Sequence, residues 1–323
     1  MSRKIVSTLL LGAWIATVGS AGHSFAVEKV RMGYLQSDLH QLAAFIALEK
    51  GFYKKKGVEV TVAGIFRAGP EEMSAFASRD LDFGYVGEAP ATVAVANRVA
   101  NVRIIAQANL EGSAVVIQKG SGIKDLKDLM EKTVAVPGYA TVQDFLIRKA
   151  LSDYRIPIKA VNIIIIKPPE MIPALRTKQI DSFLAWEPYP SKAITSGVGE
   201  AFILSKKIWP KHPCCVLVAD AQFIEKNPGI IMRILRAHMK ATQFIRENPK
   251  EALDIGVKYT GMDSETVELA MKNIYYEYIP DVQGELDYVT FLQEIGQIKN
   301  VEPKNFVKEI IQADFINKII TKK

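Results

Sequence analysis

The stretch RDLDFGYVGEAPATVA, residues 79 to 94, has a counterpart in KQIDSFLAWEPYPSKA, residues 178 to 193. One ungapped offset of 99 positions (178 − 79) relates the two and aligns Glu88 with Glu187. Each stretch runs from a charged turn through an apolar segment to an acid and a proline. This repetition predicts a chain built from two similar units.

The segments around each stretch follow the same order of strand, helix, strand, short helix, strand and helix. Apolar residues at helical spacing alternate with short apolar runs, as in doubly wound α/β proteins. The run 163–166, four isoleucines, is typical of a parallel strand buried on both faces. We expect strands at 29–35, 58–64 and 81–87 in the first unit, and at 132–138, 161–167 and 180–186 in the second. The fold class is therefore α/β, with two doubly wound lobes.

Composition is that of a globular protein. The chain has 323 residues, of which 49% are hydrophobic and 24% charged, enough for one large domain or two smaller ones. The formal net charge is +6, but basic residues are scattered and do not interleave with aromatic ones. A nucleic-acid surface needs both features, so we expect no nucleic-acid partner.

The first 26 residues have the order of a secretory signal peptide. MSRK is positively charged, an apolar run follows, and small residues end at Ala26. We expect cleavage after Ala26, which leaves 297 residues (323 − 26) and, without Arg3 and Lys4, a net charge of +4 (6 − 2). A membrane anchor is the alternative, but the run is short for spanning a bilayer. The expected location is the periplasm.

The repeated order also predicts where a ligand binds. In open parallel sheets, ligands lie beyond the carboxyl ends of the strands, where helix N-termini favour anions. The loops in this position are 35–38, 87–91, 137–143 and 186–189. If the lobes face each other, these loops meet in one cleft.

Several motifs carry a family resemblance. GFYKKKGVEV, DFGYVGEAPA, VAVPGYAT, AWEPYPSKA and FIRENPKEAL occur in this order, and with them the chain resembles the NMT1-like periplasmic substrate-binding proteins of nitrate, sulfonate and taurine ABC importers. The resemblance implies a type II periplasmic-binding fold of two lobes joined by two crossover segments. Lobe 1 would comprise 27–112 and 215–323, lobe 2 would comprise 113–214, and the crossings would lie near 111–115 and 213–218.

The same resemblance implies the function. We expect a monomeric binding protein that closes its cleft on a small anion or zwitterion and delivers it to ABC permease and ATPase subunits. No cofactor, metal or enzymatic activity is implied. The alternative ligand is a thiamine-precursor pyrimidine, stacked on Trp186 with its amino group hydrogen-bonded to Glu187.

Each candidate contact also has a structural interpretation. Trp186 could stack on a ligand or cover a strand end. Glu88 and Glu187 could cap helices or pair with an ammonium group, and Thr141 could cap a helix or donate to an oxyanion. We expect Gln36 rather than His40 to contact the ligand, with His40 at the surface. The predicted ligand-binding residues are Gln36, Ser37, Gly87, Glu88, Ala89, Tyr139, Thr141, Trp186 and Glu187.

Cys214 and Cys215 are the only cysteines in the sequence. Neighbours on an extended strand point to opposite faces, so a disulfide between them would need a strained turn. We expect two buried thiols on the returning strand. His212 lies nearby, but the spacing matches no structural zinc pattern, and we expect no metal site.

An enzyme is the rival class. A related fold occurs in a pyrimidine-synthesising family with a cysteine-rich iron motif, which is longer than the cysteine pair here. The sequence has no nucleophile elbow, phosphate loop, dinucleotide fingerprint or H-E-x-x-H motif. Binding is therefore favoured over catalysis.

Overall fold

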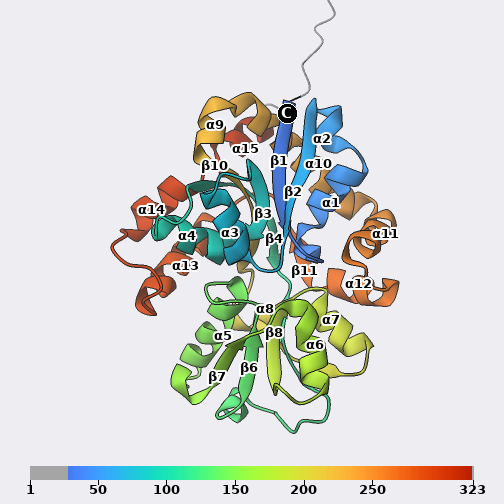
Figure 1. Cartoon of the computed structure of the whole chain (residues 1–323), viewed down its shortest axis with the longest axis vertical. Coiled ribbons are helices and arrows are strands. Elements are labelled where there is room, and N and C mark those ends of the chain that lie inside the picture. The colour runs from blue at the N-terminus through green and yellow to red at the C-terminus, as the bar shows by residue number, and fades with distance from the viewer. Residues whose placement is uncertain (1–27, 322–323) are drawn as a thin grey trace, which may run out of the picture.

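Two sheets divide the molecule into an upper and a lower lobe (Figure 1). The computed structural model describes residues 28–321, so the predicted signal peptide lies outside the described residues. Lobe 1 contains a six-stranded sheet in the order β11-β4-β10-β3-β1-β2, and lobe 2 contains a five-stranded sheet in the order β7-β6-β8-β5-β9. The α/β class with two lobes is confirmed.

The strands of lobe 1 are β1 (Glu28–Leu35), β2 (Val58–Phe66), β3 (Phe83–Gly87), β4 (Val102–Glu111), β10 (Pro213–Asp220) and β11 (Ile274–Tyr276). Those of lobe 2 are β5 (Ser113–Gln118), β6 (Thr133–Val136), β7 (Asn162–Ile165), β8 (Ser182–Trp186) and β9 (Gly199–Leu204).

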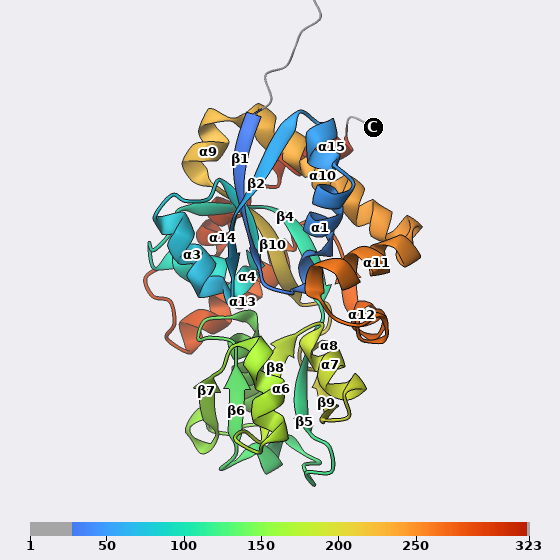
Figure 2. The same cartoon turned by 45° about the vertical axis from the view of Figure 1, so that its right-hand side comes forward.

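Helices cover both sheets (Figure 2). In the first half these are η1 (Leu39–Gln41), α1 (Leu42–Glu49), α2 (Phe52–Lys55), α3 (Gly69–Ala77) and α4 (Glu88–Ala96). Lobe 2 has η2 (Leu126–Leu129), α5 (Val142–Asp153), η3 (Ile158–Ala160), α6 (Pro168–Arg176), α7 (Tyr189–Thr195) and α8 (Ser205–Ile208). The returning segment forms α9 (Ala221–Lys226), α10 (Pro228–Glu247), α11 (Pro249–Thr260), α12 (Ser264–Met271), α13 (Val282–Glu294), α14 (Pro303–Ile310) and α15 (Asp314–Ile320).

The two sheets share one topology. In lobe 1 the parallel strands β2, β1 and β3 lie side by side, and in lobe 2 the parallel strands β7, β6 and β8 repeat this order. An antiparallel strand follows on the same side of each set, β10 beside β3 and β5 beside β8. The prediction of two doubly wound lobes is therefore correct, and the structure adds that both lobes share one strand order.

The repeated stretch makes the same local structure twice. Asp82 Oδ2 accepts the backbone N–H of Arg31 at 2.7 Å, and Asp181 Oδ2 accepts that of Thr133 at 2.9 Å. Each aspartate thereby ties the start of its strand to the neighbouring strand, β1 or β6. The helix before each aspartate ends in a left-handed residue, Arg79 with φ 61° and Lys178 with φ 60°. The offset of 99 positions thus relates true structural equivalents (178 − 79).

Two crossings join the lobes. Gly112 is the single residue between β4 of lobe 1 and β5 of lobe 2. The chain leaves lobe 2 after α8 and enters lobe 1 at Pro213, so the return crossing lies within 209–212, just before the predicted 213–218. The returning helices then pack on lobe 1, with α10 against α1 and α13 against α4.

One predicted strand has a different environment. The isoleucine run falls in β7, which is the edge strand of its sheet and is only partly buried, with Ile165 exposed by 44%. The prediction of burial on both faces was wrong. A run of isoleucines reflects β propensity as much as burial, and propensity alone does not separate an edge strand from a central one.

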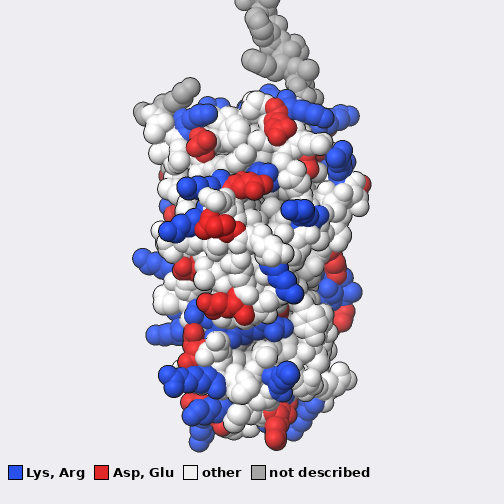
Figure 3. Space-filling view, turned by 90° about the vertical axis from the view of Figure 1, so that its left-hand side faces the viewer, with Lys and Arg blue, Asp and Glu red and all other residues white. Residues whose placement is uncertain are grey.

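Figure 3 shows one face, on which acidic and basic side chains are intermixed. Within residues 28–321, no helix has both the length and the apolar character needed to cross a membrane.

Candidate functional site

A narrow cavity lies between the lobes at the carboxyl ends of the parallel strands. The space in it that can hold a water-sized molecule is about 10 Å³. The four loops expected to meet there all contribute to its wall. The lining residues are Leu35, Asp38, His40, Gly69, Gly87, Pro90, Thr141, Val142, Gln143, Trp186, Cys214 and Cys215.

Three helices begin at this cavity. Gly69 is the first residue of α3, Gly87 is the N-cap of α4, and Thr141 is the N-cap of α5. Thr141 Oγ1 accepts the N–H of Asp144 at 3.2 Å and donates to the carbonyl of Gly138 at 2.8 Å, so its hydroxyl is engaged as a cap. First-turn amides lack acceptors within their helix, which leaves donors for an anion at these ends.

Trp186 forms part of the opposite wall, at the end of β8 in lobe 2. Its side chain is 3% exposed and makes an edge contact with Tyr189, with ring centroids 6.2 Å apart. The indole Nε1 is buried and has no acceptor among the described residues. A buried N–H without a partner is costly, so a ligand oxygen would stabilise it.

Glu88 does not reach the cavity. Its carboxylate lies inside lobe 1, where Gln107 Nε2 donates to Oε2 at 3.0 Å. Burial and the negative charge of Glu285 on α13 raise the pKa of Glu88 well above its usual range. Burial likewise raises the pKa of Glu285 to about 8, although Thr92 Oγ1 donates to it at 2.7 Å. Both carboxyl groups are therefore harder to ionise than a free glutamate.

Glu187, the equivalent acid in lobe 2, acts as a helix cap. Its carboxylate accepts the N–H of Ser191 in α7 at 3.1 Å and the side-chain amide of Asn273 from lobe 1 at 2.7 Å. Burial raises its pKa. Glu187 therefore connects the lobes but is not among the residues that line the cavity.

The remaining predicted contacts also lie outside the cavity wall. Gln36, the preferred residue of the first loop, is exposed. Ser37 Oγ donates to the carbonyl of Thr260 at 3.0 Å, Tyr139 is 52% exposed, and Ala89 is buried within α4. Of the nine predicted residues, the cavity wall includes Gly87, Thr141 and Trp186.

Sequence reasoning missed the floor of the cavity. Asp38, His40, Cys214 and Cys215 all line it and are all buried. His40 is fully buried, so its expected place at the surface was wrong. The cysteines are free and buried, as expected, but their neighbour is His40 and not His212. No local motif predicts this cluster of buried side chains, because Cys214 and His40 are 174 positions apart in the sequence.

A β-bulge explains why adjacent cysteines face the same side. Along β4, Leu110 pairs with Pro213 and Asn109 with Cys215, which leaves Cys214 as an extra residue in β10. Such an insertion interrupts the alternation of side chains and redirects them. The expectation that the two thiols point to opposite faces fails for this reason.

Electrostatic coupling is strong within this cluster. Burial raises the pKa of Asp38 to about 7 despite the neighbouring imidazole. Burial alone would lower the pKa of His40, but the charges of Cys214 and Asp38 outweigh it and raise that pKa to about 9. Burial opposes ionisation of Cys214 too, but the contacts with Cys215 and His40 lower its pKa well below the usual value. Burial raises the pKa of Cys215.

Ion pairs join the lobes near the N-termini of α3 and α6. Lys167 of lobe 2 lies 2.6 Å from Glu71 of lobe 1, and Arg67 of lobe 1 pairs with Glu170 of lobe 2. The two acids are related by the repeat offset of 99 (170 − 71). Elsewhere Lys192 of α7 lies 2.6 Å from Asp263, the N-cap of α12. The lobes are thus closed on the cavity.

The chain was compared with known proteins. It is 28% identical over 325 residues to a protein named "Putative aliphatic sulfonates-binding protein" from Bacillus subtilis, with 98% of this chain and 95% of that protein covered. The solved nitrate-binding protein NrtA of Synechocystis PCC 6803 superposes with a TM-score of 0.82 at 18% identity, covering 92% of this chain and 89% of that one. The aliphatic sulphonate-binding protein SsuA of Escherichia coli gives 0.75 at 17% identity, covering 88% and 97%.

These structural likenesses establish a periplasmic binding protein fold, in agreement with the type II arrangement expected from the sequence. In this chain the strand order 2-1-3 is repeated in both lobes and followed by an antiparallel strand. Residues 25–256 match the NMT1-like family, and the chain belongs to that family.

Proposed function

We propose that this chain is an extracytoplasmic solute-binding protein that closes on a small oxyanion, of the sulfonate or nitrate type, and delivers it to an ABC importer. One observation carries the proposal. Three helix N-termini and the unpartnered indole N–H of Trp186 converge on a cavity enclosed by both lobes. This arrangement supplies hydrogen-bond donors, which suits a compact anion.

The relatives support the ligand class. The names of these relatives refer to aliphatic sulfonates and to nitrate. No Lys or Arg lines the cavity among the described residues, so backbone amides and the indole N–H would bear the anion. A zwitterion such as taurine would place its ammonium group toward the carboxylate of Asp38, which also lines the cavity.

The pyrimidine alternative loses its proposed hydrogen bond. It required Glu187 to accept from the ligand's amino group, but Ser191 and Asn273 already occupy that carboxylate. Stacking on Trp186 would remain. A pyrimidine therefore serves as the comparison ligand in the test below.

The test is a thermal-shift screen followed by calorimetry. Taurine, ethanesulfonate, nitrate, sulfate and an aminopyrimidine are each added to the purified chain lacking residues 1–26. A ligand that binds only the folded state raises the melting temperature by mass action, by an amount that grows with concentration. We expect a sulfonate or nitrate to give the largest shift. A shift with the pyrimidine alone would overturn the oxyanion assignment.

Export is tested separately. The charged, apolar and small-residue order of residues 1–26 supports cleavage after Ala26. N-terminal sequencing of the protein recovered from the periplasm should begin at Val27. Retention of Met1 in a membrane fraction would contradict export by this route. Co-purification with a permease and an ATPase subunit would support the proposed partners.

A further inference from the structure

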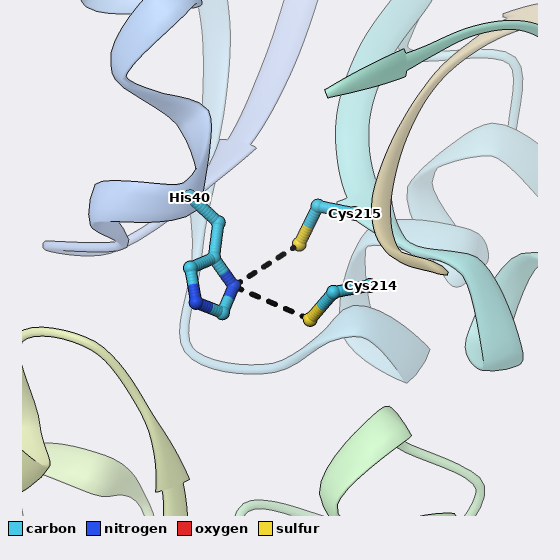
Figure 4. A group of neighbouring side chains, drawn as sticks. All are labelled: His40, Cys214 and Cys215. Carbon is cyan, nitrogen blue, oxygen red and sulfur yellow. Dashed lines mark hydrogen bonds between the residues drawn. The ribbon is translucent and has the colours of Figure 1, made fainter. Parts of the chain in front are cut away.

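The buried group at the floor of the cleft has a geometry that oxyanion binding does not explain. We propose that His40, Cys214 and Cys215 bind one transition-metal ion of the zinc type, with the carboxylate of Asp38 beside them. Figure 4 shows both sulfur atoms directed at the same ring nitrogen of His40. This inference is independent of the transported ligand.

The distances fit a tetrahedral ion. Cys214 Sγ lies 3.4 Å and Cys215 Sγ 3.7 Å from His40 Nδ1, and the three ligand atoms are all within 4.8 Å of one another. Zinc bonds of about 2.3 Å to sulfur and about 2.0–2.1 Å to nitrogen give a tetrahedral S···N edge of about 3.6 Å. The observed edges agree with that value without any rearrangement of the backbone.

Asp38 lies beside these three ligands, although neither of its oxygens is within 4.8 Å of all three ligand atoms. Its Oδ1 lies 3.6 Å from His40 Nδ1, and its Oδ2 lies 3.8 Å from Cys215 Sγ. The N–H of His40 donates to Oδ1 at 2.9 Å and Gln41 Nε2 donates to Oδ2 at 3.1 Å, which fixes the carboxylate. One lone pair on each oxygen remains available, because a carboxylate oxygen accepts more than one bond.

The outer hydrogen bond of His40 selects the tautomer that a metal needs. His40 Nε2 lies 2.7 Å from the carbonyl oxygen of Gly112, so Nε2 carries a proton, and Nδ1, which would lose its proton when a metal binds, faces the sulfurs. A backbone carbonyl that holds the second ring nitrogen is the usual support of a metal-binding histidine. Gly112 has φ +87°, and a Cβ there would lie 2.4 Å from His40 Nε2, so only glycine permits this contact.

The geometry does not fit a catalytic relay. A nucleophile, base and acid in series require the base to use one ring nitrogen for each partner. Here Cys214, Cys215 and Asp38 all approach Nδ1, while Nε2 is bound to a carbonyl. Convergence of several donor atoms on one point is the pattern of an ion's ligands.

The charges of these side chains also favour a bound cation. Asp38 is buried and its one ion-pair partner among residues 28–321 is His40. A buried carboxylate beside two thiols is costly without a cation, and a bound divalent ion would balance it. Thiolate and imidazole ligands favour zinc-type ions over calcium or magnesium, which prefer oxygen. Since all four side chains line the cleft cavity, an ion can enter while the lobes are apart.

The experiment uses the full-length mature chain, reduced with a phosphine and freed of metal. One equivalent of zinc should remain bound after gel filtration. Titration with Co²⁺ should saturate at one equivalent and give thiolate-to-cobalt charge-transfer bands together with the visible bands of a tetrahedral ion. Less than about a tenth of an equivalent of either metal, or a cobalt spectrum without sulfur bands, would overturn the site.

Variants assign the ligands. Cys214→Ser, Cys215→Ser and His40→Asn should each weaken Co²⁺ binding by about 100-fold or more, since loss of an outer-shell partner alone costs about 10- to 100-fold. His238→Asn is the matched control. His238 is an equally buried histidine, whose ring nitrogens are bound to Tyr85 and to the Gln107 carbonyl, and its loss should leave the cobalt spectrum unchanged.

Two further results would contradict the proposal. One is wild-type affinity in either cysteine variant, and the other is equal loss in His238→Asn. Circular dichroism confirms that each variant is folded, and the wild-type titration decides the question if a variant is not. Sulfonate binding is measured on the same samples, so that failure of the metal site and failure of the proposed transport function are recorded independently.

Discussion

Glu88 and Glu187 occupy equivalent positions in the two lobes, directly after β3 and β8, and both are buried. In lobe 1 the carboxyl group of Glu88 turns into the interior, where it accepts from Gln107 and where burial and the charge of Glu285 raise its pKa. In lobe 2 the carboxylate of Glu187 accepts from its own helix and from Asn273. One sequence position therefore serves two different roles.

The returning segment makes the difference. Helix α13 packs against α4 in lobe 1 and brings Glu285 beside Glu88, whereas the helix that packs against α7 in lobe 2 is α12, and Asn273, which follows it, brings an amide to Glu187. The repeat determines the backbone position of each acid. What surrounds the acid depends on residues far along the chain.

The largest expected effect concerns the carboxyl pair of lobe 1. The folded pair binds a proton that the unfolded chain releases above about pH 4.5, so its contribution to stability falls as pH rises from there toward the folded pKa of Glu285, about 8. Glu285→Gln should remove a large share of this loss. Relative to the wild type, the free energy of unfolding of the variant should therefore be higher at pH 8 than at pH 5 by roughly 3 kcal/mol. Urea denaturation at both pH values measures it.

Glu187→Gln in lobe 2 is the matched variant. It removes an acid whose pKa is also raised by burial but which has no second carboxyl group bonded to it. We expect a smaller change in the pH dependence than for Glu285→Gln. An identical pH profile for Glu285→Gln and the wild type would show that the two acids of lobe 1 do not share a proton.

The next effect tests whether both lobes hold the ligand. In lobe 2, Trp186→Phe keeps the apolar ring and removes the indole N–H. In lobe 1, Gly87→Val places a Cβ about 3.1 Å from Val142 Cγ2 of lobe 2, which hinders closure. Each should raise the ligand Kd by about tenfold or more, or about 1.4 kcal/mol. Calorimetry provides the values.

Gln36→Ala is the control, because Gln36 is exposed and outside the cavity wall. It should leave Kd unchanged. Small-angle scattering of the wild type should also show a smaller radius of gyration with ligand. If only the lobe 2 variant weakens binding and the radius stays constant, closure of two lobes on the ligand is the wrong mechanism.

The smallest effect concerns the crossed ion pairs. Glu71→Gln and Glu170→Gln each remove one exposed pair between the lobes. Such pairs contribute about 0.2–1 kcal/mol, so ligand affinity should fall by about fivefold at most. The difference should disappear at high salt, where exposed charges are screened. A loss that persists at about 1 M salt would mean that these residues contact the ligand.

Much of the fold was predictable because its signals are local. The repeated stretches at 79–94 and 178–193 predict two lobes. The positions where helices start after apolar strands predict the cleft between them. Trp186 and Thr141 were found because each lies at the junction of a strand and a helix.

The rest depended on contacts between distant segments. The bulge at Cys214 changes which way a side chain points, and no residue type in the sequence marks it. His40 lies on an amphipathic segment, which predicts an exposed polar residue. In the fold, Gly112 and the returning strand β10 cover it. Gln36 was preferred for its place in a loop, but its direction is set by packing that the sequence does not display.

The position of β10 between β3 and β4 has a consequence for synthesis of the chain. Strands β3 and β4 are consecutive in sequence but do not pair, and the space between them is filled by residues that emerge more than a hundred positions later. A nascent chain that ends before Pro213 therefore contains a complete lobe 2 sheet and a lobe 1 sheet with two unpaired edges. Open edges of this kind recruit other strands. Lobe 1 cannot finish folding until translation has passed Asp220.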